Sequence, residues 1–81
     1  MQSEFKLKKE LGHLILSEYV SIKEYQDKFY FVKKLNNLFP DIPDKVFYTT
    51  LDLTNSELKM PSKKRLFIRT FIEKFRSLDI R

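Results

Sequence analysis

Residues 63–78 read KKRLFIRTFIEKFRSL, and this stretch is the strongest indication of the fold. Its apolar side chains recur every three or four residues, which places them on one face of an α-helix. They are Phe67, Ile68, Phe71, Ile72, Phe75 and Leu78. Burial of each large apolar side chain is worth about 1.5–3 kcal/mol, so this face can provide much of the core energy. We therefore expect a helix over residues 63–78, with Ser62 as its N-terminal cap.

Two earlier segments carry the same helical spacing. In residues 4–20 and in residues 22–39, apolar side chains return at intervals of three or four. They are Leu7, Leu11, Leu14, Ile15 and Tyr19 in the first segment, and Ile22, Tyr25, Phe29, Val32, Leu35 and Phe39 in the second. Pro40 and Pro43 end the second helix, because proline has no backbone N–H to donate. Only Ser21 separates the two patterns, which predicts a tight corner or a nearly continuous helix.

Residues 44–60 give a mixed signal. A helix fits the spacing of Phe47, Leu51, Thr54 and Leu58, whereas the run of residues 46–50, VFYTT, is β-branched and aromatic, which favours a strand. We expect a short helix over residues 44–51, then a turn, then one helical turn near residues 55–59. A strand over residues 46–50 is the alternative.

The composition fits one small, basic helical domain over residues 1–81. The chain has a net charge of +5, 42% apolar residues, eight Phe and four Tyr. Domains usually contain about 100–150 residues, which leaves no room for a second one. The single glycine argues against a turn-rich β fold. We predict an all-α fold, a small compact bundle of three long helices plus a short irregular or helical third segment.

The same composition bears on the compartment. The chain contains no cysteine, which excludes disulfides and thiolate nucleophiles and fits a reducing environment. The longest apolar run, residues 29–32, is far shorter than the about 20 residues that span a bilayer. Glu4 and Glu10 interrupt the N-terminal segment, so we expect no secretory signal peptide. We predict a cytoplasmic protein without a membrane span.

Residues suited to catalysis are few. His13 is the only histidine, and on a helical wheel it lies opposite the apolar stripe, where a solvated side chain is expected. The pairs Asp41 with Asp44 and Glu18 with Glu24 are explained by helix N-termini, where negative charge is favourable. One glycine is too few for a phosphate-binding loop. We therefore predict no enzymatic activity, no cofactor and no metal ion.

Positive charge is concentrated at the C-terminal end. Residues 61–81 carry seven basic and two acidic side chains, an excess that equals the net charge of the whole chain. On a helical wheel Arg65, Arg69 and Arg76 lie within about 40° of one another. Such an edge suits phosphate backbone, although a solvated helix face with Arg69 paired to Glu73 explains it equally well. The predicted nucleic-acid contacts are Lys63, Lys64, Arg65, Arg69 and Arg76.

A second feature lies in residues 22–39. Tyr30, Phe31 and Leu38 fall away from the main apolar stripe of this segment. Three interpretations fit: a wider core face, a homodimer seam, or a surface for a protein partner. For Phe31 and Leu38 we favour the core face or a dimer seam, and Tyr30 is the better candidate for a functional contact, because Lys23 and Lys34 flank it on the wheel. Together the three residues are the candidate partner interface.

These patterns favour a small non-enzymatic binding protein. The leading prediction is a nucleic-acid-binding regulator or accessory factor that contacts the phosphate backbone of DNA or RNA through its basic C-terminal helix. The alternative is a protein-interaction module, such as an inhibitor, adaptor or assembly factor, that docks on a larger protein. A homo-oligomer, most simply a dimer, is compatible with both.

Overall fold

The computed structural model describes residues 2–78 of the chain. Within this range there are four α-helices and one two-stranded sheet, so the predicted all-α bundle is confirmed. In chain order the elements are α1 (Gln2–Leu14), β1 (Tyr19–Val20), α2 (Tyr25–Leu38), α3 (Asp44–Glu57), β2 (Ser62–Lys63) and α4 (Lys64–Leu78). None of the described helices is both long and apolar enough to cross a membrane.

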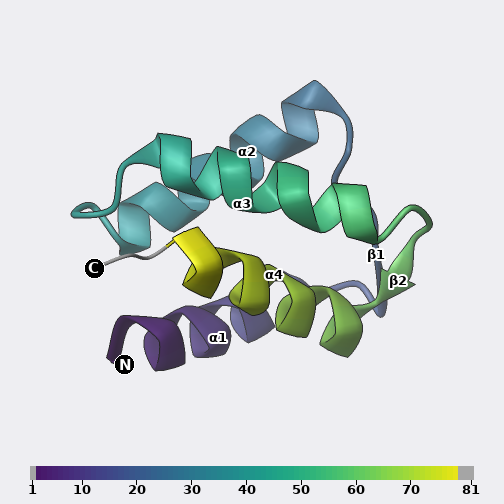
Figure 1. Ribbon diagram of the computed structural model, residues 1–81, viewed down its shortest axis with the longest axis horizontal. Helices are drawn as coiled ribbons and strands as arrows, with labels where there is room; N and C mark the ends of the chain where they lie inside the picture. The colour runs from purple at the N-terminus through teal and green to yellow at the C-terminus, as the bar shows by residue number, and fades with distance from the viewer. Residues whose placement is uncertain (1, 79–81) are drawn as a thin grey trace.

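The helix α4 lies between α1 and α3, and α3 packs in turn against α2 (Figure 1). Each of these neighbours runs antiparallel to the next. The strands β1 and β2 pair antiparallel, with Tyr19 opposite Lys63 and Val20 opposite Ser62. The backbone N–H of Lys64 also donates to the carbonyl of Glu18 at 2.8 Å. This short sheet ties the connection between α1 and α2 to the start of α4, and so sets how α4 lies beside α1.

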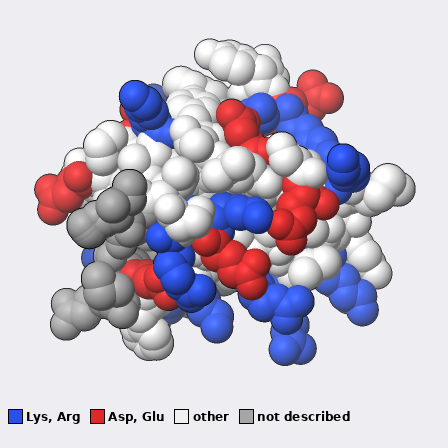
Figure 2. All heavy atoms as spheres, viewed as in Figure 1, with Lys and Arg blue, Asp and Glu red and all other residues white. Residues whose placement is uncertain are grey.

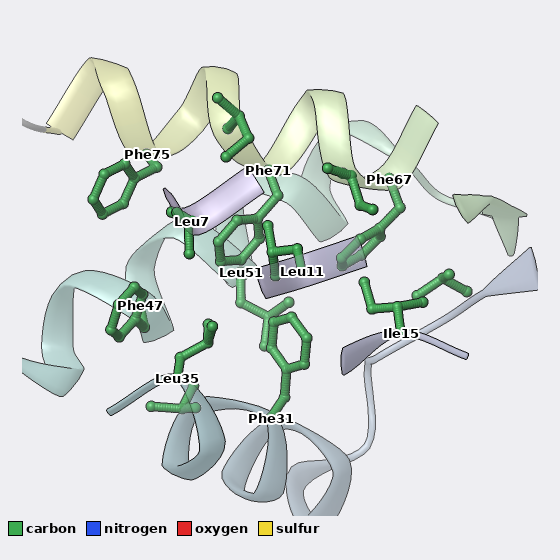
Figure 3. Close-up of a cluster of buried hydrophobic side chains, with 14 of the residues drawn as sticks. Leu7, Leu11, Ile15, Phe31, Leu35, Phe47, Leu51, Phe67, Phe71 and Phe75 are labelled. Atoms are coloured by element: carbon green, nitrogen blue, oxygen red, sulfur yellow. The ribbon is translucent and has the colours of Figure 1, made fainter. Parts of the chain in front are cut away.

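The core is filled mainly by phenylalanine and leucine from all four helices (Figure 3). The predicted stripe of α4 supplies Phe67, Phe71 and Phe75, which are all buried. Phe31 of α2 meets Phe67 and Phe71 edge to face, with ring centroids 6.2 and 5.7 Å apart. Edge-to-face pairs are favourable beyond their buried area. The apolar face of residues 63–78 is thus the centre of the bundle.

The third segment differs from the prediction. It is one continuous helix of 14 residues, so the expected turn after residue 51 and the alternative strand over residues 46–50 are both wrong. Thr50 and Thr54 are fully buried, and their hydroxyls donate to the carbonyls of Val46 and Thr50 at 2.7 and 2.8 Å. Helix propensities differ by only a few tenths of a kcal/mol, so burial of this face outweighs the β-branched composition.

The first two helices are also shorter than predicted. The helix α1 ends at Leu14 and α2 begins at Tyr25, so an extended connection of residues 15–24 replaces the tight corner at Ser21. Tertiary contacts hold this connection. Val20 is buried, and the Asn55 side-chain amide donates to the Ile22 carbonyl at 2.8 Å. The predicted cap Ser62 lies in β2 instead, and its hydroxyl donates to the Met60 carbonyl at 3.0 Å.

Candidate nucleic-acid interface

A groove runs between α1 and α4. Its larger part, about 560 Å³, is lined by Lys8, Gly12, Lys63, Arg65, Leu66, Ile68 and Arg69. An adjoining part, about 330 Å³, is lined by Glu4, Phe5, Lys8, Arg69, Ile72, Glu73 and Arg76. Lys8 and Arg69 line both parts, so we treat them as one feature, the α1–α4 groove. We call the larger part its β2 end and the smaller part its Glu4 end.

The helical period of α4 explains why arginines line the groove. Arg65 and Arg69 are one turn apart and share the edge next to Ile68 and Ile72, whose side chains are buried. Burial of the apolar face therefore leaves this edge at the boundary between core and solvent. Both arginines are exposed, and neither forms an ion pair with another described residue.

The β2 end of the groove is the most basic part of this surface. Lys8, Lys63, Arg65 and Arg69 line it, and no Asp or Glu among the described residues does. Figure 2 shows Lys and Arg side chains projecting along the lower edge of the molecule, on the side of α4 and α1. Elsewhere two cations are partnered: Lys74 pairs with Glu57 at 2.6 Å and Lys28 with Asp52 at 3.1 Å.

Arg76 belongs to the predicted arginine edge but has a carboxylate partner. Its Nε and Nη2 donate to the two carboxylate oxygens of Glu4, at 3.1 and 2.8 Å. These hydrogen bonds lower the pKa of Glu4 and raise the pKa of Arg76 relative to their ordinary values. The pair joins the first turn of α1 to the last turn of α4, so Arg76 fastens the two helices together at this end of the groove.

Lys64 is likewise engaged within the fold. Its ammonium donates to the Gly12 carbonyl at 2.7 Å, in the last turn of α1. The last carbonyls of a helix lack partners inside the helix, and a cation there is favourable. Of the five predicted contacts, Lys63, Arg65 and Arg69 therefore line the β2 end, whereas Lys64 and Arg76 fasten α1 to α4.

Two groove residues were missed by the sequence analysis, Lys8 and Phe5. Both lie on the flank of α1 next to its buried leucines, and Phe5 is 74% exposed. The helical period places both residues on one flank of α1. Only the packing of the helices shows that this flank faces α4.

The structure separates the three residues of the candidate partner interface. Phe31 is only 8% exposed and Leu38 is partly buried against the core, so these two side chains belong to the bundle interior. Tyr30 is 64% exposed. Tyr25 and Phe29, which the sequence analysis placed on the core stripe, are exposed as well, because α2 turns Phe31, Val32 and Leu35 inward.

These three exposed residues, Tyr25, Phe29 and Tyr30, form what we call the α2 aromatic face. The rings of Phe29 and Tyr30 lie 6.3 Å apart, edge to face. The ammonium of Lys33 is 5.6 Å from the Phe29 ring centroid, within the range of a cation–π contact. This face and the α1–α4 groove involve different helices.

Two further observations concern catalysis and relatedness. His13 is exposed, and among the described residues no group of three or more His, Asp or Glu could hold a metal ion. Comparisons with protein-family models, curated proteins and solved structures found no significant match.

Proposed function

We propose that this protein is a small non-enzymatic regulator or accessory factor that binds nucleic acid, with phosphate groups at the β2 end of the α1–α4 groove. The observation that carries the proposal is the set of four cations, Lys8, Lys63, Arg65 and Arg69, that line one open hollow without a carboxylate among its described lining residues.

The physical basis is electrostatic. Arginine presents several N–H donors in a planar fork that fits phosphate oxygens. Each phosphate that a cation neutralises releases condensed counterions, so affinity falls steeply as salt concentration rises. The apolar side chains of Leu66 and Ile68 line the same hollow beside the cations.

The test is binding of labelled oligonucleotides at about 50 and about 200 mM salt. The variant Arg65→Gln/Arg69→Gln should bind more weakly, and the slope of log K against log salt should become shallower by about 1.4–1.8. Lys45→Gln/Lys59→Gln removes the same charge from exposed positions outside the groove and serves as the matched control. If both double variants weakened binding equally, the loss of affinity would come from the change in net charge alone, which would contradict the proposal.

A protein-interaction module is the second candidate, and the α2 aromatic face favours it. Exposed aromatic clusters are typical of the centres of protein interfaces. If the partner is a second copy of the chain, the mass in solution should be that of a dimer, and Phe29→Ala/Tyr30→Ala should return it to a monomer. A monomer across the accessible concentration range would exclude this self-association.

A further inference from the structure

Phe5 is an exposed aromatic side chain at the edge of the groove. It is 74% exposed, and it lines the Glu4 end of the groove together with Lys8 and Arg69. An exposed aromatic ring next to cations in a groove is the arrangement that single-strand-binding proteins use, with bases stacked on the ring and cations along the backbone.

The shape of the groove favours a single strand over a duplex. Proteins that read duplexes insert a protruding helix or ribbon into a major groove about 12 Å wide. Here Lys8, Arg65 and Arg69 instead line a hollow between two helices. A flexible single strand can enter a concave site of this kind. The convex surface of a duplex instead contacts the edges of the hollow and does not enter it.

Charge divides the groove into two parts. The charged residues that line the β2 end are all cations, whereas at the Glu4 end the carboxylates of Glu4 and Glu73 stand beside the cations. Phosphates are therefore favoured more at the β2 end than beside Phe5, where the two carboxylates offset part of the positive charge and an uncharged base can stack on the ring. From Phe5 to Gly12 the groove follows α1 for about 10 Å, the length of about three stacked nucleotides.

We infer that the α1–α4 groove binds single-stranded nucleic acid, with phosphates at Lys8, Lys63, Arg65 and Arg69 and one base stacked on Phe5. This inference rests on the proposed function and adds the strandedness of the ligand and the residue that holds a base.

The experiment uses the full chain and four labelled probes of about twelve nucleotides, within the usual site size of single-strand-binding folds. The probes are an oligothymidylate, an oligouridylate, an abasic strand with the same phosphates, and a duplex. We expect both base-bearing single strands to bind more tightly than the duplex and than the abasic strand. The ratio between oligothymidylate and oligouridylate then distinguishes DNA from RNA.

Two pairs of variants address Phe5. Phe5→Ala should weaken binding of the base-bearing strands about 5- to 150-fold, the usual loss of a stacked base, and leave the abasic strand unchanged. Tyr30→Ala removes a similarly exposed aromatic side chain outside the groove. It should change neither the binding of the base-bearing strands nor that of the abasic strand. The chain has no Trp, so Phe5→Trp introduces a single reporter whose fluorescence should be quenched by a bound single strand. Tyr30→Trp, the matched reporter, should remain unquenched.

The outcomes separate this inference from the proposed function. If the duplex binds as tightly as the single strands, or if Phe5→Ala binds like the original chain while Arg65→Gln/Arg69→Gln binds weakly, the groove contacts only phosphates. The inference is then wrong and the proposed function stands. If no probe binds even at about 50 mM salt, both are wrong.

Discussion

Replacing Gly12 by alanine is expected to stabilise the protein. Gly12 lies in the last turn of α1, and a Cβ atom placed on it would have no heavy atom within 4 Å. Its φ is not positive, so alanine can adopt the same backbone conformation without strain. The glycine is therefore not required by the packing of α1 against α4.

The size of the effect follows from helix propensity. Glycine is less favourable than alanine by about 0.8–1.0 kcal/mol in a helix interior. Gly12 is two residues from the end of α1, where the preference is weaker, so we expect a gain of about 0.5–1 kcal/mol. For a chain of this size each kcal/mol corresponds to about 4–8 °C. The melting temperature should therefore rise by about 2–8 °C.

Thermal unfolding followed by circular dichroism measures this gain, and a companion variant tests the groove. Leucine has nearly the helix propensity of alanine, so Gly12→Leu should also keep the protein folded. Its side chain would occupy the β2 end of the groove beside Lys63 and Arg65 and should weaken oligonucleotide binding. A lower melting temperature for Gly12→Ala would refute the claim of open space at this position. Full affinity in Gly12→Leu would show that the ligand does not enter the groove there.

Three more substitutions test the fold. Phe71→Ala removes a fully buried ring and should cost about 3–5 kcal/mol, seen as a large shift of the urea midpoint; a shift near zero would contradict the core described above. Lys64→Gln removes the ammonium that donates to the Gly12 carbonyl and should cost about 1 kcal/mol, with faster amide exchange confined to the end of α1. The hydrogen bonds with Arg76 lower the pKa of Glu4 in the folded state. The pair therefore stabilises the protein fully at pH values above the ordinary pKa of glutamate. This stabilisation is lost as the pH falls through the lowered pKa. Melting temperatures measured from neutral to acidic pH should therefore fall less steeply for Arg76→Gln, and identical profiles would show that the pair contributes nothing.

The helical segments were predictable where one apolar face dominates the pattern. The helix α4 begins one residue later than expected and ends at the expected residue, Leu78. Its stripe of Phe67, Phe71 and Phe75 is buried as predicted. When the apolar side chains follow a strict helical period, they share one face of the helix. The spacing in the sequence and the burial in the fold then select the same side chains.

Prediction failed where local preference and tertiary burial disagree. The helix predicted over residues 44–51 is present although residues 46–50 favour a strand locally, but it continues through the expected turn to Glu57, because Thr54 is buried on the same face as Phe47 and Thr50. Tyr25 and Phe29 continue the apolar spacing of α2, yet both are exposed. The packing of α2 against α3, and the ring contacts of Phe31 with α4, bury a neighbouring stripe instead. An apolar pattern that is broader than one face does not say which part of it the neighbouring helices cover.

In the candidate site, too, some features follow from the sequence and others only from the tertiary structure. The one-turn spacing of Arg65 and Arg69 on an edge of the last helix follows directly from residue order, because the helical period fixes which side chains share an edge. Tertiary structure alone brings Lys8 and Phe5 of α1 to that edge and uses Lys64 and Arg76 to fasten α1 to α4. These contacts join residues more than fifty positions apart, and such pairings depend on how whole helix faces pack rather than on any local pattern.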